Sequence, residues 1–179
     1  MDDATKKIRI IGSVASGKTT LAKELSEYLH IPYIEMDNLV WDRGSGTDRR
    51  RTPQERDACL HQVLVEDQWI LEGVHRGDWT EETFLEADVV LMLDPPYPLR
   101  TWRIIRRFFR QKAGLESANY RPSLKIFLRM FRWNRHFEKV EKRKFLQSEA
   151  GLLPKTKRVT WWSGDLENLD SLVRRRDMG

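Results

Sequence analysis

Residues 12–19 read Gly-Ser-Val-Ala-Ser-Gly-Lys-Thr, and this stretch decides the fold. It follows the apolar run at residues 8–11 and precedes residues 20–29, whose apolar positions have helical spacing. Glycines let such a loop wrap around a phosphate chain, and the N–H groups that begin the helix supply partial positive charge. A turn that only joined a strand to a helix would need neither Lys18 nor Thr19. The stretch therefore predicts a site for a nucleoside triphosphate.

The two residues after the second glycine have distinct expected roles. Lys18 is expected to reach the terminal phosphates, and the Thr19 hydroxyl is expected to hold Mg²⁺. We therefore expect ATP and Mg²⁺ as cofactors. The residues expected to contact the nucleotide are Gly12, Ser13, Ala15, Ser16, Gly17, Lys18, Thr19 and Thr20.

The length and composition indicate one domain. The 179 residues, 1–179, suffice for one α/β domain with its own core but not for two full-sized ones. The single cysteine, Cys59, cannot form an internal disulfide, and the first residues lack the apolar segment of a signal peptide. No run approaches the ~18 apolar residues of a membrane span. We expect a cytoplasmic protein without membrane contact, and its oligomeric state stays open, a dimer included.

Basic residues gather in one part of the chain. The net charge is +5, but residues 100–144 hold fifteen basic and three acidic residues, a net charge of +12. Aromatic residues interleave with these charges in the second half of the segment, as they do in some nucleic-acid-binding proteins. Their helical spacing instead favours one buried helix face with the cations opposite, formed by Phe127, Met130, Phe131, Asn134 and Phe137.

Apolar runs alternate with helical patterns along the chain. This alternation predicts an α/β fold of three layers, with a five-stranded parallel sheet and helices on both faces. The expected strands are residues 8–11, 32–36, 69–71, 89–93 and 159–162. Ligands of such sheets bind at the carboxyl ends of the strands. The residues expected at those ends are Gly12, Asp37, Glu72, Asp94 and Ser163.

Other segments interrupt this alternation. Residues 42–52 contain glycines and three consecutive arginines and are expected to form a mobile loop, within an acceptor-side segment at 42–66. Two basic helices are expected at 99–111 and 123–147, joined by a short lid at 111–122.

Two carboxylates are expected at the centre of the site. Glu72 ends a run of bulky apolar residues, the Walker-B position, where it can accept a hydrogen bond from Thr19 or from a water on Mg²⁺. The alternative is a solvent-facing glutamate at a strand end. Asp37 is expected to lie near the transferred phosphate and to orient or deprotonate an attacking hydroxyl. Its alternative role is a helix N-cap, and the two roles are compatible.

Arginines follow the fourth expected strand on one helix stripe. Arg103, Arg107 and Arg110 are three and four residues apart, so they share a face. Guanidinium groups directed at a triphosphate stabilise the charge of the moving phosphoryl group. We expect Arg103 and Arg107, in the first turns of the helix, to act with Lys18 and Asp37 in catalysis. For most other cations of the segment a solvated face is expected.

The arrangement resembles the nucleoside monophosphate kinase group of P-loop proteins. Residues 71–76 read Leu-Glu-Gly-Val-His-Arg and look like that group's strand ending in an acid and a glycine, followed by an arginine. The resemblance implies that Arg76 holds the anion of the acceptor. It also implies a nucleotide-kinase-like fold with a small helical lid. The residues assigned to the acceptor side are Asp37, Trp41, Glu72, Gly73 and Arg76.

A closer likeness is to small bacterial P-loop proteins known as topology modulation or adenylate-kinase-like proteins. It rests on residues 12–19, 36–41, 69–73 and 93–96, then on Arg103, Arg107 and the pair Trp133-Asn134. Two departures occur in this chain. Glu72 stands where aspartate is common, which preserves metal chemistry, and the residues after Gly73 differ from the common asparagine and tyrosine. The family supplies no substrate to carry over.

Three functions follow from these patterns. The leading hypothesis is a phosphotransferase that moves the γ-phosphoryl group of Mg·ATP to a small acceptor, either nucleotide-like or a hydroxyl compound. The alternatives are a nucleotide-dependent DNA-binding regulator that grips phosphates with the basic segment, and a simple NTP hydrolase. The four histidines lack metal-ligand spacing, so no zinc site is expected.

Overall fold

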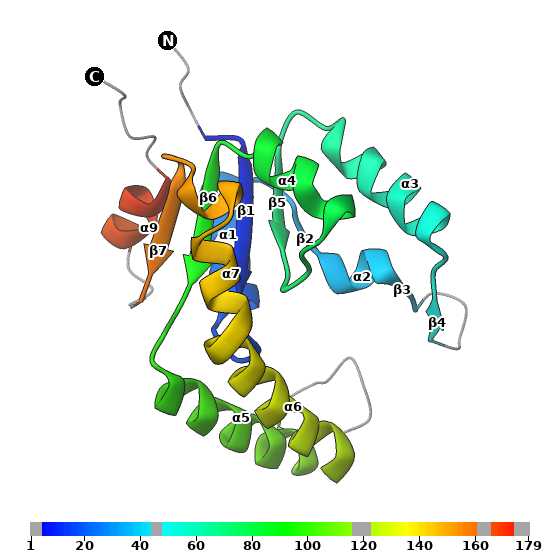
Figure 1. The fold of residues 1–179 in the computed structure, drawn as a ribbon, viewed down its shortest axis with the longest axis vertical. Helices are drawn as coiled ribbons and strands as arrows, with labels where there is room; N and C mark the ends of the chain where they lie inside the picture. The colour runs from blue at the N-terminus through cyan, green and yellow to red at the C-terminus, as the bar shows by residue number, and fades with distance from the viewer. Residues whose placement is uncertain (1–4, 44–47, 116–122, 161–165, 174–179) are drawn as a thin grey trace.

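A five-stranded parallel sheet forms the centre of the protein (Figure 1). The computed structural model describes residues 5–43, 48–115, 123–160 and 166–173. The strand order is β2-β5-β1-β6-β7, with neighbouring strands parallel throughout, so the predicted α/β fold is confirmed. The strands are β1 (Lys7–Gly12), β2 (Tyr33–Glu35), β5 (Trp69–Glu72), β6 (Val89–Leu93) and β7 (Thr156–Val159).

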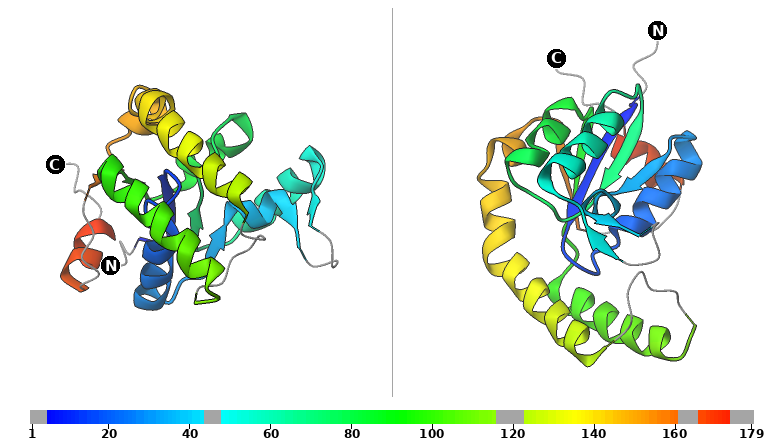
Figure 2. Two further views of the ribbon diagram at one scale, coloured as in Figure 1. Left: turned by 90° about the horizontal axis from the view of Figure 1, so that it is seen from below. Right: turned by 90° about the vertical axis from the view of Figure 1, so that its right-hand side faces the viewer.

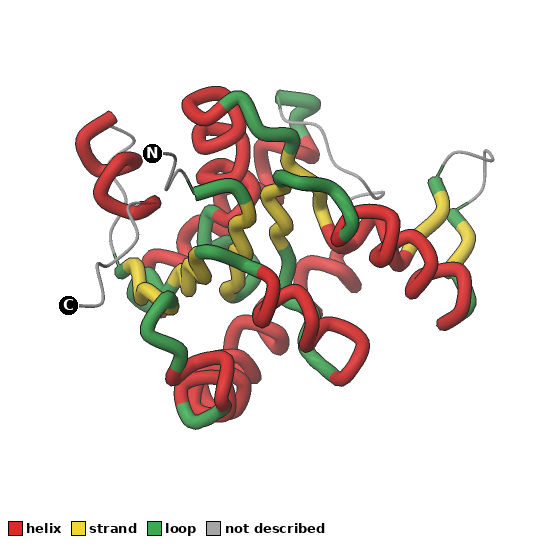
Figure 3. Tube along the Cα trace, turned by 90° about the horizontal axis from the view of Figure 1, so that it is seen from above, coloured by secondary structure: helices red, strands yellow, loops and turns green. Residues whose placement is uncertain are grey.

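Helices lie on both sides of the sheet, as Figure 3 shows. The long ones are α1 (Lys18–Leu29), α3 (Pro53–Leu64), α5 (Tyr97–Lys112) and α6 (Leu124–His136). The shorter ones are α2 (Met36–Val40), α4 (Glu81–Glu86), α7 (Lys142–Leu146), α8 (Glu149–Leu152) and α9 (Leu166–Val173), with a 3₁₀ turn at Asp78–Thr80 and a π turn at Phe137–Glu141. Among the described helices, none has the length and apolar character needed to cross a membrane.

Each face of the sheet has its own apolar core. On one face, Ile8 and Ile10 of β1 pack with apolar residues of α1 and α9. On the other face, Ile11 packs with apolar residues of α3, α4 and α7, among them Phe84 and Phe145. Strands covered on both faces read as continuous apolar runs, which explains why β1 and β6 were visible in the sequence.

Helices α5 and α6 form an arm that projects beyond the carboxyl ends of the strands (Figures 1 and 2). The rings of Phe108 and Phe127 stack between the two helices with centroids 4.3 Å apart. Met130 and Asn134 of α6 are also buried. The aromatic and apolar stripe of the basic segment therefore packs within the arm, as its helical spacing predicted.

Two expected strands have different bounds in the structure. Strand β2 ends at Glu35, and Asp37 lies in helix α2 rather than at a strand end. The N-cap of α2 is Glu35, so Asp37 does not cap it. The last strand begins at Thr156, three residues before the predicted start, and ends at Val159. Trp161, Trp162 and the expected strand end at Ser163 lie outside the described residues. An edge strand has one sheet neighbour and tolerates polar residues, so the apolar run did not mark it.

The segment expected as a mobile loop contains a short antiparallel pair. Strands β3 (Trp41–Asp42) and β4 (Arg49–Arg50) pair with each other, with Trp41 opposite Arg50. Arg49 binds both carboxylate oxygens of Glu55, and its Nη2 lies 3.5 Å from Asp42 Oδ2. These contacts join β4 to α3 and to β3, which the glycines and consecutive arginines did not predict. Residues 44–47 lie outside the described part.

Candidate active site

The phosphate-binding loop joins β1 to α1 through a close turn. Gly12 ends β1, and a Cβ atom there would lie 2.6 Å from the carbonyl oxygen of Leu93 and 2.8 Å from Ser16 Oγ. No side chain fits at this position, because the loop passes directly against β6. Ser16 Oγ is buried and has no hydrogen-bond partner among the described residues. A buried, unpartnered hydroxyl inside such a loop fits a site that an anionic ligand completes.

Lys18 lies at the mouth of this loop. Its Nζ donates a hydrogen bond to the carbonyl oxygen of Ser13 at 2.9 Å. Burial lowers the pKa of Lys18, while the carboxylates of Glu72 and Asp37 act to raise it. The positive charges of Arg9 and Arg107 also lower the pKa. A desolvated cation surrounded by charges of both signs can exchange its carbonyl contact for a phosphate oxygen.

Thr19 and Glu72 are in direct contact. The Thr19 hydroxyl donates to Glu72 Oε1 at 2.8 Å, and Glu72 is 5% exposed at the end of β5. No group of three histidine, cysteine or acidic residues able to hold a metal occurs among the described residues. A hydroxyl and one carboxylate fit Mg²⁺, which proteins usually bind with one or two carboxylates plus substrate phosphates and water.

The arm reaches the loop through two side chains. Arg103 of α5 donates from Nη1 to the carbonyl oxygen of Ser16 at 3.1 Å, and burial lowers the pKa of Arg103. Ser13 Oγ donates to Asn134 Oδ1 of α6 at 3.2 Å. Arg107 lies near enough for its charge to lower the pKa of Lys18, whereas Arg110 is exposed. The predicted arginine stripe is therefore turned toward the loop only over its first two members.

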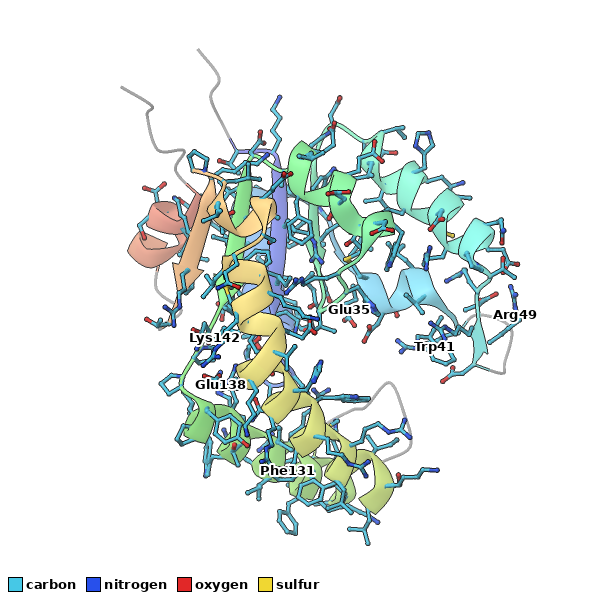
Figure 4. The ribbon with its side chains drawn as sticks, in the orientation of Figure 1. Glu35, Trp41, Arg49, Phe131, Glu138 and Lys142 are labelled. Atoms are coloured by element: carbon cyan, nitrogen blue, oxygen red, sulfur yellow. The ribbon has the colours of Figure 1, made fainter. Side chains whose placement is uncertain are left out.

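A buried ionic cluster holds the arm in this position. Asp94, 4% exposed after β6, contacts Arg100 of α5, Lys142 of α7 and Arg158 of β7, with Lys142 Nζ 2.9 Å away. Glu138 contacts both Arg100 and Lys142 (Figure 4). Asp94 was expected at a ligand-binding strand end, but it serves to join the arm to the sheet.

Asp37 of α2 is in contact with His75, which follows β5. Nε2 of His75 donates to Asp37 Oδ1 at 2.8 Å. This hydrogen bond holds the pKa of Asp37 below its usual range, and the charges of His75 and Lys18 act in the same direction, while burial opposes them. Asp37 is therefore an ionised carboxylate that accepts a hydrogen bond from the imidazole and lies within electrostatic reach of Lys18.

The other residues expected on the acceptor side have different surroundings. Gly73 follows β5 closely packed, because a Cβ atom there would lie 2.9 Å from Met36 Cβ. Trp41 is 38% exposed in β3 (Figure 4). Arg76 donates to the carbonyl oxygen of Glu141 at 2.6 Å and lies over the ring of Phe145. Arg76 thus joins the loop after β5 to the π turn in this structure, and its expected contact with an acceptor anion stays a prediction.

Arg9 is the positioning residue that the sequence did not reveal. It lies in the centre of β1, fully buried, with its guanidinium 5.1 Å from the ring centroid of Phe84. Burial lowers its pKa to about 9, against the attraction of Glu72, so it stays protonated at neutral pH. Its nitrogens donate to four carbonyl oxygens, those of Ile10, Leu71, Gly73 and His75. The sequence signal for this role was a single charged residue within the apolar run at residues 8–11.

The fold is similar to those of several solved kinase structures. The chain is similar to shikimate kinase from Acinetobacter baumannii in complex with shikimate, with a TM-score of 0.59 at 15% identity over 93% of this chain and 90% of that one. It is also similar to shikimate kinase from Bacteroides thetaiotaomicron, with a TM-score of 0.55 at 16% identity over 95% of both chains. A gluconokinase from Sinorhizobium meliloti gives 0.50 at 14% identity, over 97% and 90%.

Sequence comparison adds no narrower assignment. No protein-family model matches the chain, and no curated protein matches its sequence. The likeness to topology modulation proteins therefore stays a prediction. What the structural likenesses show is the fold of small P-loop kinases.

Proposed function

We propose that the protein is a phosphotransferase that moves the γ-phosphoryl group of Mg·ATP to a small hydroxyl-bearing acceptor. One observation carries the proposal: Lys18, the Thr19–Glu72 pair and Arg103 meet at the phosphate-binding loop, and the charge of Asp37 acts on Lys18 from the acceptor side. Asp37, hydrogen-bonded to His75, adds a carboxylate that can orient an acceptor hydroxyl. The kinase fold of the structural neighbours supports the same reading.

The residues of the donor half bind and orient the triphosphate. The loop N–H groups and the start of α1 would hold its phosphates, and Lys18 would supply a positive charge to the terminal ones. When bound, Mg²⁺ neutralises charge on the phosphates, and Thr19 and Glu72 are the residues that would hold it, directly or through water. Arg103 and Arg107 lie on the arm side, where guanidinium groups stabilise the charge that spreads over the transferred group.

The transfer step joins the two halves of the site. The acceptor oxygen forms a bond to the γ-phosphorus while the bond from that phosphorus to the bridging oxygen breaks. Asp37 orients the attacking hydroxyl and takes its proton, and His75 holds the carboxylate in place. ADP retains the electron pair of the broken bond.

Lys18→Ala tests the donor half, and Lys23→Ala, exposed on the same helix, is its matched control. We expect Lys18→Ala to abolish ATP binding, measured by calorimetry, while its circular dichroism spectrum and unfolding midpoint stay close to wild type. ADP release should then be screened across nucleosides, nucleoside monophosphates and small hydroxyl compounds. Tight ATP binding by Lys18→Ala would contradict the assignment of the ATP site to this loop. ADP release that is independent of every acceptor would indicate a hydrolase.

Exposed tryptophan–arginine pairs on the arm favour nucleic-acid binding as a second candidate function. Two exposed tryptophans, Trp102 and Trp133, each lie beneath an arginine, Arg106 and Arg129, with distances of 5.3 and 5.8 Å to the ring centroids. Exposed aromatic and cationic pairs also occur where proteins bind nucleic acid. Such binding would weaken steeply between about 50 and 200 mM salt. Absence of DNA binding at physiological salt would eliminate this function.

A further inference from the structure

A cavity of about 360 Å³ lies beside the Asp37–His75 pair, outside the phosphate-binding loop. Small-molecule sites have volumes of roughly 300 to 1,000 Å³, so a compact ligand fits. No described residue of its lining is acidic. Those that matter here are Arg50, Arg51, Arg56, His75 and Trp79.

Two of the three arginines are fixed by the protein itself. Arg51 donates to the carbonyl oxygens of Asn38 and Trp41, at 2.6 and 2.9 Å, and so closes the end of α2. Arg56 pairs with Asp57 at 2.6 Å, and its guanidinium lies 4.2 Å from the ring centroid of Trp79. Both side chains form walls of the cavity.

Arg50 differs from its neighbours. It is exposed on β4, and its side chain forms no hydrogen bond or ion pair with any described residue. Successive residues of a strand point to opposite sides. Arg49, the adjacent residue, accordingly directs its guanidinium to both oxygens of Glu55, at 2.9 and 3.0 Å. Arg50 is therefore the cation that this cavity offers to a bound anion.

Trp79 provides a wall rather than a stacking surface. Arg56 covers one side of its ring, and the ring of His75 lies 5.7 Å away at an angle of 58°. A nucleobase binds an aromatic side chain through a free face. Because Arg56 occupies one face, Trp79 offers less of its ring to a nucleobase, and the volume of about 360 Å³ favours a compact acceptor.

The same cavity also has a lining residue that contacts the proposed proton acceptor. His75 lines the cavity and hydrogen-bonds Asp37, and the charge of Asp37 acts on Lys18 in the phosphate-binding loop. A ligand held at Arg50 therefore has its other end near the proposed proton acceptor. We propose that this cavity is the acceptor site and that the acceptor is a compact hydroxylated anion, with its anionic group at Arg50 and its hydroxyl at His75 and Asp37. The role of the bound anion as phosphoryl acceptor rests on the proposed phosphotransferase function, whereas the binding of an anion at Arg50 does not.

Arg50→Gln tests the site, with Arg106→Gln as matched control, since both remove one charge from an exposed arginine and Arg106 lies on α5, outside the cavity. Inorganic phosphate is titrated calorimetrically without ATP into the two variants and the Arg50 wild type, all three carrying Lys18→Ala so that the phosphate-binding loop does not contribute. Loss of a hydrogen bond to a charged group costs enough to weaken binding about tenfold or more. We expect that loss for Arg50→Gln and little change for Arg106→Gln. Equal phosphate affinity in wild type and Arg50→Gln, or no phosphate binding by the wild type, would overturn the site.

ATP turnover then distinguishes the kinds of acceptor. Gluconate and glucose 6-phosphate are each compared with uncharged glucose, which separates carboxylate from phosphate as the anionic group, and AMP tests a nucleotide. Preference for either compact anion, with a raised KM in Arg50→Gln, supports the proposal. Preference for glucose or AMP overturns it. Arg50-dependent phosphate binding without turnover of any compound supports the anion site and counts against the phosphotransferase function alone.

Discussion

Replacement of Arg9 by methionine removes a buried charge from the centre of the sheet. The guanidinium nitrogens donate to four carbonyl oxygens at 2.7 to 3.3 Å, two of them belonging to Gly73 and His75 in the loop after β5. Methionine fills part of the same volume but donates nothing. Arg9→Met therefore removes one donor from each of these carbonyl groups and leaves Glu72 with one cationic neighbour fewer.

The expected cost follows from these contacts. Removing one partner of a buried charged contact costs about 3 to 5 kcal/mol. Part of this cost is offset, because burial of the guanidinium is itself unfavourable, as its lowered pKa shows. We expect the free energy of unfolding to fall by about 2 to 4 kcal/mol. For a chain of this size that corresponds to a decrease in Tm of roughly 5 to 15 °C.

Urea unfolding followed by tryptophan fluorescence measures this change. Arg106→Met, on the exposed face of α5, is the control and should change stability by less than about 0.5 kcal/mol. Arg9→Lys separates charge from geometry: its ammonium keeps a cation near Glu72 but lacks the planar fork that reaches both pairs of carbonyls. We expect an intermediate loss. An unchanged urea midpoint and slope in Arg9→Met would refute the positioning role.

Three further perturbations test neighbouring parts of the site. Gly73→Ala places a Cβ atom 2.9 Å from Met36 Cβ and should lower the free energy of unfolding by about 1 to 3 kcal/mol; wild-type stability would show that the backbone yields there. Glu72→Gln removes the charge beside Thr19, so half-maximal turnover should need about tenfold more Mg²⁺, and an unchanged Mg²⁺ titration would contradict metal support by Glu72. Asp37 has a folded pKa below its usual 3.8, because His75 donates a hydrogen bond to its carboxylate. Its contribution to stability is complete above that usual value and is lost as the pH falls through the folded one. Wild type should therefore lose more stability than Asp37→Asn on acidification from about pH 5 to 2, and parallel losses in chemical denaturation would argue against the pair.

The strongly patterned elements were predictable from the sequence. Strands β1, β5 and β6 are buried on both faces, so their apolar runs stood out, and α5 and α6 kept a helical spacing. The weakly patterned elements were not. Strand β7 carries Lys157 and Arg158 at the sheet edge, and β4 consists of two arginines, of which Arg49 is held by Glu55 of α3. Their strand conformation depends on partners distant in sequence.

The sequence by itself determined the phosphate-binding loop, because its spacing places two glycines, Lys18 and Thr19 at the junction of one strand and one helix. Only the tertiary structure decided what meets that loop. The contact between Thr19 and Glu72 spans 53 residues, and that between Arg103 and Ser16 spans 87. The carbonyl oxygens bound by Arg9, the hydrogen bond from His75 to Asp37 and the cavity next to Arg50 likewise exist only once the strands have paired in order. Local spacing fixes local backbone geometry, whereas the surroundings of a charged side chain depend on which distant segments the sheet and its helices bring beside it.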